Sequence, residues 1–257
     1  MIPLKDQEAI RMKFAQELLG PVKIDYFTQK ELDIIVPGRE PCATCKPTRQ
    51  MLQELAALSD LISLRVHNIE DEREEAARFG VERIPGIVLR GRDTASMKLY
   101  GMPAGSEFPT FLDSISDVSC KAVLLSPESV NALRKVKEDI RVKVFGAPMC
   151  PYSPGPARAA FQLSIVNPRV KAEVIQADEF PTLAQRYDVK AVPLTVIEER
   201  IAVVGAVPEK GLVEQVVKAS QSAAAQPSDV RGPSTPWAPP KAEKGEPQRG
   251  GSGLILP

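Results

Sequence analysis

The sequence predicts an α/β protein in which one arrangement of strands and helices occurs twice in succession. Segments with the hydrophobic periods of strands and helices alternate along the chain, and the alternation recurs at an offset of 108 residues. A hydrophobic fraction of 43% in 257 residues is enough for buried cores in two domains of ordinary size. We therefore expect domains at residues 1–120 and 121–220, followed by a disordered tail at residues 221–257.

The first copy opens with an amphipathic helix at residues 6–19. Ile10, Phe14 and Leu18 recur there at four-residue spacing, and a Gly-Pro pair ends the helix. The following segments are expected to be a strand at 22–27, a helix opening at 42–45, a strand at 61–69, a helix at 70–79, hairpin strands at 86–89 and 97–100, and a helix at 107–115.

The second copy opens with a helix from Ser126 to about residue 139. Ser126 is a capping residue, and Pro127 suits the first helical position. The expected elements that follow are a strand at 141–145, a helix at 156–165, a strand at 170–176, a helix at 181–187, a hairpin at 194–197 and 201–204, and a helix at 210–220.

The spacing of two Cys-to-Pro pairs supports an internal duplication. Pro85 follows Cys42 by 43 positions, and Pro193 follows Cys150 by 43 positions. Similar residues fall at the same offset between these sites: Val66 and Val174, Glu70 and Asp178, Phe79 and Tyr187, Val81 and Val189, Val88 and Val196. Agreement of this kind without a gap indicates two repeats of one domain.

The composition changes at Gln221. From there onward the chain is rich in Pro, Gly and Ser and has no apolar period before its last few residues. Such a segment buries too little surface to offset its conformational entropy, so we expect it to be disordered. Trp237, the only Trp, lies in this tail and is weak evidence for a docking segment.

Charge and cysteine usage narrow the function classes. Lys plus Arg and Asp plus Glu both number 33, so nothing favours binding to nucleic acid or to an anionic membrane. The first residues lack the basic and apolar regions of a signal peptide, and no apolar run approaches the roughly 18 residues of a membrane span. We expect a cytoplasmic protein, in which a close Cys pair serves redox chemistry or metal binding more often than it staples a fold.

Cys42 and Cys45 form the clearest chemical motif because they are expected to open a helix. A thiolate at a helix N-terminus meets unpaired N–H groups and the positive end of the dipole, which lower its pKa toward about 3.5–7.5. Cys42 would be the exposed nucleophile and Cys45 the buried resolving thiol. Half of a zinc site and an incidental pair are the alternatives, but zinc needs about four ligands and His67 is the only His. We favour the redox interpretation.

Pro85 and Pro193 each lie just before a predicted buried strand, so their bonds to Ile84 and Val192 are candidate cis peptides. A cis bond would leave the backbone of Ile84 or Val192 free to pair with an extended substrate peptide. An ordinary trans proline at the first residue of a strand is the alternative. Recurrence at one distance from a Cys in both repeats favours the cis interpretation.

Together these features resemble the thioredoxin and glutaredoxin arrangement, and more closely the two-domain, glutaredoxin-like protein disulfide oxidoreductases. The resemblance covers about residues 3–220. It is carried by Glu54-Leu55 to Ser59-Asp60, Arg83-Ile84-Pro85, Tyr100-Gly101-Met102-Pro103-Ala104-Gly105 with Glu107-Phe108, Leu125-Ser126-Pro127-Glu128, and Cys150-Pro151-Tyr152-Ser153-Pro154. It implies two tandem thioredoxin-like domains, each a mixed sheet sandwiched by helices, with Cys42 and Cys45 as the redox pair and with cis bonds at Pro85 and Pro193.

The chain departs from this family at two places. The second site of the family usually reads Cys-Pro-Tyr-Cys, whereas Ser153 occupies the resolving position here. Cys150 can therefore form mixed disulfides but cannot release them from within its own motif. The loop between Phe27 and Cys42 is also long, and we interpret it as a surface insertion.

The leading hypothesis is a thiol–disulfide oxidoreductase that exchanges disulfides with protein substrates through Cys42 and Cys45. No Gly-rich nucleotide or flavin motif is present, so we expect no cofactor, no metal, and electrons from an external reductase or small thiol. One alternative is a substrate-binding adaptor that acts through the monothiol Cys150. In another, Cys150 and glutathione hold an iron–sulfur cluster, as in the monothiol glutaredoxins.

Three other residues have structural interpretations. We expect Cys120, between the domains, to pack as a small hydrophobe and His67 to be packed or half-exposed on its strand. Asp25 is either a buried proton acceptor for Cys45 or an acid at the end of a strand.

Overall fold

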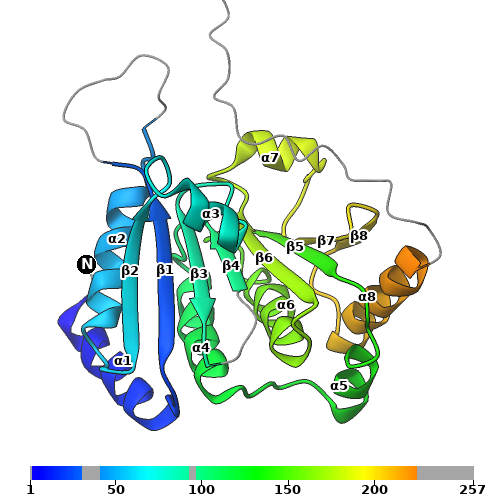
Figure 1. Cartoon of the computed structure of the whole chain (residues 1–257), viewed down its shortest axis with the longest axis horizontal. Coiled ribbons are helices and arrows are strands. Elements are labelled where there is room, and N and C mark those ends of the chain that lie inside the picture. The colour runs from blue at the N-terminus through cyan, green and yellow to red at the C-terminus, as the bar shows by residue number, and fades with distance from the viewer. Residues whose placement is uncertain (1, 31–40, 93–96, 225–257) are drawn as a thin grey trace, which may run out of the picture.

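The structure, a computed structural model, describes residues 2–30, 41–92 and 97–224 and contains the two predicted repeats (Figure 1). The first repeat comprises α1 (Leu4–Glu17), β1 (Val22–Thr28), α2 (Cys45–Ala56), β2 (Ile62–Asn68), α3 (Arg73–Phe79), β3 (Gly86–Arg90), β4 (Met97–Tyr100) and α4 (Glu107–Cys120). The second comprises α5 (Pro127–Leu133), β5 (Ile140–Gly146), α6 (Pro154–Val166), β6 (Val170–Gln176), α7 (Pro181–Arg186), β7 (Leu194–Ile197), β8 (Ile201–Val204) and α8 (Glu209–Ala224). The predicted order of elements is confirmed in both repeats. None of the helices in the described ranges is long and apolar enough to cross a membrane.

The strands of both repeats form one mixed sheet in the order β2-β1-β3-β4-β6-β5-β7-β8. In each repeat the first strand pairs in parallel with the second and antiparallel with the third, and the third and fourth strands form a hairpin. The repeats meet where β4 runs parallel to β6, with Lys98 opposite Glu173 and Tyr100 opposite Ile175. The predicted mixed sheet is therefore confirmed, and the two repeats share it.

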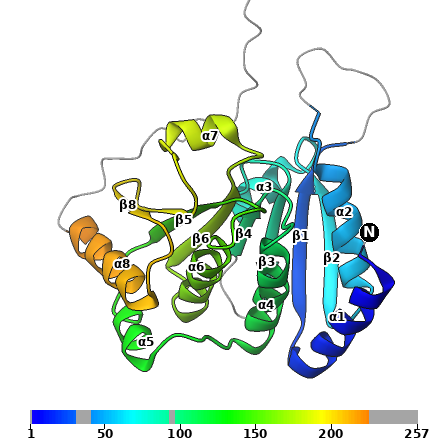
Figure 2. The same ribbon diagram turned by 180° about the vertical axis from the view of Figure 1, so that it is seen from behind.

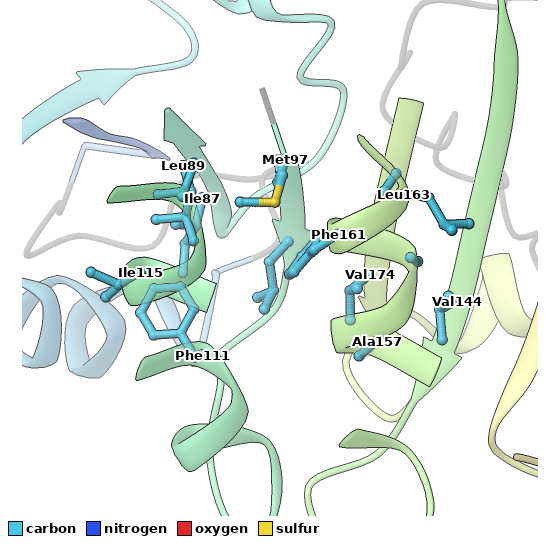
Figure 3. Close-up of a cluster of buried hydrophobic side chains, with 14 of the residues drawn as sticks. Ile87, Leu89, Met97, Phe111, Ile115, Val144, Ala157, Phe161, Leu163 and Val174 are labelled. Atoms are coloured by element: carbon cyan, nitrogen blue, oxygen red, sulfur yellow. The ribbon is translucent and has the colours of Figure 1, made fainter. Parts of the chain in front are cut away.

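Helices cover both faces of this sheet (Figures 1 and 2). The larger core lies beneath α1, α2, α4, α5, α6 and α8, and the smaller core lies beneath α3 and α7. Side chains of both repeats meet in the larger core, where Met97 and Phe111 of the first repeat belong to the same buried cluster as Phe161 and Val174 of the second (Figure 3). The hydrophobic effect that stabilises each repeat therefore also holds the two together.

The helix that opens the second repeat begins as predicted and ends earlier. The Ser126 hydroxyl accepts a hydrogen bond from Ser129 N at 3.3 Å, and Pro127 is the first helical residue. The helix ends at Leu133 and not near residue 139. The reason is distant in sequence, because the buried Asn167 amide donates to the carbonyls of Leu133 and Val136 at 2.8 and 2.9 Å.

Two other helices are longer than predicted. α4 continues to Cys120, whose half-buried thiol donates to the Ser116 carbonyl at 2.9 Å; burial raises the pKa of this thiol. Cys120 is therefore a packed residue at the end of a helix. α8 continues to Ala224, so the predicted tail begins at least four residues too early. The disorder predicted for the remaining tail, with Trp237, lies outside the described residues, as does most of the insertion before Cys42.

Asp25 belongs to a buried polar cluster on the α3 side of the sheet. Its carboxylate accepts hydrogen bonds from His67 Nε2 at 2.9 Å and from Arg90 Nε at 3.0 Å. His67 is fully buried, stacks on Phe27 with ring centroids 4.5 Å apart, and binds Glu72 through Nδ1 at 2.7 Å. The bond from His67 holds the pKa of Glu72 below its usual range. Because this cluster faces away from α2, the interpretation of Asp25 as a proton acceptor for Cys45 has no support.

Candidate active site

Cys42 and Cys45 form a disulfide with their Cα atoms 5.4 Å apart. Cys42 is half-buried, and Cys45 is buried with 4% of its surface exposed. Helix α2 begins at Cys45, so Cys42 lies in the turn that leads into the helix and not inside it. The structure thus agrees with the predicted difference in exposure between the two sulfurs, while the helix begins three residues later than its first cysteine.

Hydrogen bonds from β1 and α2 fix the backbone of the cysteine turn, which we define as residues 42–45. The Tyr26 hydroxyl on β1 donates to the Cys45 carbonyl at 2.7 Å, and the Thr48 hydroxyl donates to the Thr44 carbonyl at 2.6 Å. Burial raises the pKa of Tyr26 to about 12, so the phenol remains a donor at neutral pH. Position 45 is therefore held from strand β1 as well as from helix α2.

The bonds Ile84–Pro85 and Val192–Pro193 are both cis, as expected. The carbonyl of each proline accepts a hydrogen bond from a glycine that follows the hairpin, Gly101 at 2.9 Å and Gly205 at 2.8 Å. In the second repeat the Cys150 thiol lies 3.4 Å from the Val192 carbonyl oxygen. The structure thus places the second cysteine motif directly beside its cis-proline loop.

Ser153 occupies the position in the second repeat that Cys45 occupies in the first. It is fully buried, it precedes α6, and Ala147 N donates to its hydroxyl at 3.4 Å. A hydrogen bond from this hydroxyl lowers the pKa of the half-buried Cys150 thiol. The second site therefore holds one activated thiol next to a side chain that cannot form a disulfide with it.

A carboxyl group of the first repeat lies against this second site. Glu107, the first residue of α4, is 2% exposed, and its Oε1 has no hydrogen-bond partner among the described residues. A Cβ atom at Gly146 would come within 2.8 Å of this oxygen and within 3.1 Å of the Ser153 Cβ, so Gly146 lies closely packed between Glu107 and Ser153. Burial raises the pKa of Glu107 to about 7, and when the carboxyl is ionised its negative charge opposes ionisation of Cys150.

A carboxylate of the second repeat lies in turn against the first site. Glu179, between β6 and α7, accepts hydrogen bonds from Met102 N at 2.6 Å and from the Thr44 hydroxyl. Sequence reasoning missed Glu107 and Glu179 as site residues. Neither belongs to a cysteine motif, and it is the contact between the repeats, which includes the pairing of β4 with β6, that brings each one to the other repeat's motif.

Comparisons with known proteins agree with the duplicated fold. The thioredoxin domain family matches residues 30–108 and again residues 140–218. The F component of the alkyl hydroperoxide reductase of Xanthomonas campestris pv. phaseoli is 24% identical over 143 residues, which are 56% of this chain and 25% of that protein. The chain spans about a quarter of the length of the curated relatives it matches.

Two solved structures share the fold over most of the chain. The NTD_N/C domain of the alkylhydroperoxide reductase AhpF from Enterococcus faecalis superimposes with a TM-score of 0.74 at 19% identity, covering 84% of this chain and 100% of that one. A protein disulfide oxidoreductase from Aeropyrum pernix K1 gives a TM-score of 0.76 at 23% identity, covering 86% and 95%. The tandem thioredoxin fold expected from the sequence is therefore confirmed.

The burial of Glu107 predicts a pH dependence of stability. Below its ordinary pKa of 4.5 the carboxyl is protonated in both the folded and the unfolded chain. Between pH 4.5 and about 7 only the unfolded chain releases the proton, so the free energy of unfolding falls as the pH rises. Gln does not ionise, so Glu107→Gln removes this loss. The difference in the free energy of unfolding between the variant and the parent protein should therefore change by about 3 kcal/mol in favour of the variant between pH 4 and 7.5.

Urea denaturation across this pH range provides the measurement. Glu214→Gln, at an exposed position of α8, is the matched control and should follow the parent protein at every pH. If the curves of Glu107→Gln and the parent protein run parallel from pH 4 to 7.5, Glu107 does not titrate as its burial requires.

Proposed function

Because the chain belongs to the thioredoxin domain family, we propose that it catalyses thiol–disulfide exchange with protein substrates through Cys42 and Cys45. One observation carries the proposal: the two sulfurs close a disulfide at the start of α2, with Cys42 the more accessible of the two. An accessible thiol next to a buried partner is the arrangement that two-step exchange requires.

In the proposed reduction, the Cys42 thiolate attacks one sulfur of a substrate disulfide. A bond forms between Cys42 and that sulfur, and the other substrate sulfur leaves as a thiolate that takes up a proton. Cys45 then loses its proton and attacks Cys42, which releases the second substrate thiolate and closes the Cys42–Cys45 disulfide. Two electrons have passed to the substrate, and an external dithiol protein or a small thiol such as glutathione must return them.

The cis-proline loops are proposed to hold the substrate chain. In this role the backbone at Ile84, before Pro85, and at Val192, before Pro193, would pair with an extended peptide next to each cysteine. The 3.4 Å distance between the Cys150 thiol and the Val192 carbonyl supports this placement at the second site. Main-chain pairing of this kind tolerates many substrate sequences.

Several finer features belong to the same proposal. We assign residues 1–120 to the first domain and residues 121–220 to the second. We further propose that the protein transfers electrons as glutaredoxins do and contributes to cell redox homeostasis. A reducing compartment such as the cytoplasm suits the role because the thiols of Cys120 and Cys150 persist there. No membrane or nucleic acid partner is proposed.

A second candidate function concerns Cys150 alone. The hydrogen bond from Ser153 lowers the pKa of the Cys150 thiol, and this favours attack on a disulfide without a resolving step. The second repeat would then hold substrates or small thiols as mixed disulfides while the first repeat turns over.

Substitution of the first pair tests the leading function. Cys42→Ser should lower the rate of insulin disulfide reduction to that of the thiol reductant alone. The variant keeps Cys45 and Cys150, but neither then has a resolving cysteine in its own motif. Cys45→Ser should accumulate mixed disulfides on Cys42, visible by mass spectrometry. Cys120→Ser is the control and should leave the rate unchanged. Near-normal turnover by Cys42→Ser would show that the nucleophile is assigned wrongly.

Restoring a thiol tests the interpretation of the second site. Ser153→Cys should form a disulfide with Cys150 under mild oxidation, since Ser153 and Cys45 hold corresponding positions and Ser and Cys are close in size. Thiol counting should then find one free thiol, that of Cys120, in the oxidised variant. Three free thiols would mean that the second site lacks the geometry of a redox centre and that Cys150 has no exchange role.

A further inference from the structure

Glu179, a residue of the second repeat, accepts hydrogen bonds from two separate segments of the first redox site. Its Oε1 accepts from Met102 N at 2.6 Å, and its Oε2 accepts from the hydroxyl of Thr44, which lies between the two cysteines. The backbone of Glu179 is itself fixed, because its N–H donates to the Gln176 carbonyl at the end of β6 at 3.1 Å. The turn that follows β6 of the second repeat thus presents this carboxylate to the first.

The two donors belong to different parts of the site. Thr44 belongs to the cysteine turn, and Met102 follows Gly101, whose N–H closes the loop of cis-Pro85 at 2.9 Å. Gly101 has φ +100°, and a Cβ there would come within 2.6 Å of the Gln176 Cβ and 2.9 Å of Glu179 Oε1. One carboxylate therefore joins the cysteine turn to the proline loop, through a gap that only glycine leaves open.

The second repeat provides an internal comparison. Gly205 closes the loop of Pro193 in the same way, yet β8 is the edge strand of the sheet, and a Cβ at Gly205 would meet nothing within 4 Å. Closure of a proline loop therefore does not require a carboxylate from a neighbouring repeat. The bridge made by Glu179 is a feature of the first site.

The charge of this group bears on the sulfur chemistry. Thr44 is two residues from Cys42, so the carboxylate lies near the place where the thiolate forms, and like charges disfavour that thiolate. A less stable thiolate means a less stable reduced pair, which makes the Cys42–Cys45 couple more reducing. Lys46 and Arg49 of α2 are positively charged and oppose this effect. Both residues are present in the parent protein and in a Glu179 variant, so the comparison between the two proteins changes only the charge at position 179.

We propose that Glu179 is a positioning residue that sets the reduction potential of the Cys42–Cys45 pair from the second repeat. The inference rests on the proposed function, since it assigns a role within thiol–disulfide exchange. The second repeat then serves as part of the first redox site, whatever Cys150 itself does.

The test compares Glu179→Gln with Asp178→Asn in the full chain. Gln keeps an acceptor oxygen and the shape of the side chain, and Asp178 is an exposed carboxylate one position away. Each protein is equilibrated in glutathione buffers, and the oxidised fraction is read by mass spectrometry of the peptide that contains both cysteines. Glu179→Gln should shift the equilibrium constant about three- to tenfold toward the dithiol, where tenfold corresponds to about 30 mV. Asp178→Asn should shift it by less than twofold.

A double-mutant cycle separates positioning from general charge. Thr44→Val removes the hydroxyl that holds the Glu179 carboxylate beside the cysteine turn, which weakens its repulsion of the Cys42 thiolate. Glu179→Gln should therefore have at least a twofold smaller effect in the Thr44→Val background. Additive effects of the two substitutions, or equal shifts in Glu179→Gln and Asp178→Asn, would overturn the inference. A parent protein whose cysteine pair never equilibrates with glutathione would instead overturn the proposed function, so the two failures are distinguishable.

Discussion

The parallel pairing of β4 with β6 is the constraint on which the rest of the structure depends. It is short, running from Lys98 to Tyr100 on one side and from Glu173 to Ile175 on the other. A largely buried ion pair between Lys98 and Glu173, with Nζ and Oε1 2.6 Å apart, lies on it. Three backbone positions alone would not hold two domains together, so the helices must contribute.

That contribution comes from α4 and α6, which pack against each other on the larger core. Arg158 of α6 binds Asp113 and Asp117 of α4 at 2.6 and 2.8 Å. Phe111 and Ile115 of α4 and Ala157 and Phe161 of α6 belong to the apolar cluster drawn in Figure 3. The joined sheet then sets the positions of two carboxyl groups. Glu107 reaches the second site buried, with no partner for its Oε1 among the described residues, so burial keeps it protonated up to about pH 7. Glu179 reaches the first site half-buried and accepts two hydrogen bonds. The same side-chain type thus has two different electrostatic roles.

Sequence reasoning succeeded where the determinants are local or repeated. The equal spacing from Cys42 to Pro85 and from Cys150 to Pro193 predicted the duplication and both cis bonds, and Ser126 with Pro127 predicted the start of α5. It failed where the partner lies far along the chain. The end of α5 depends on Asn167, the role of Asp25 depends on His67 and Arg90, and the contacts of Glu179 depend on a strand pairing that no local pattern encodes.

Hydrogen exchange across a urea series tests most directly whether the two repeats form one cooperative unit. The amides of β1 (Val22–Thr28) and β5 (Ile140–Gly146) lie at the centres of the two halves of the sheet. A shared sheet and core predict that both sets open with one free energy and one urea dependence, which are those of global unfolding. If the amides of one repeat open at a lower free energy and with a smaller urea dependence while the other repeat stays protected, the repeats are independent domains. The dependence of each redox site on the other repeat would then be contradicted.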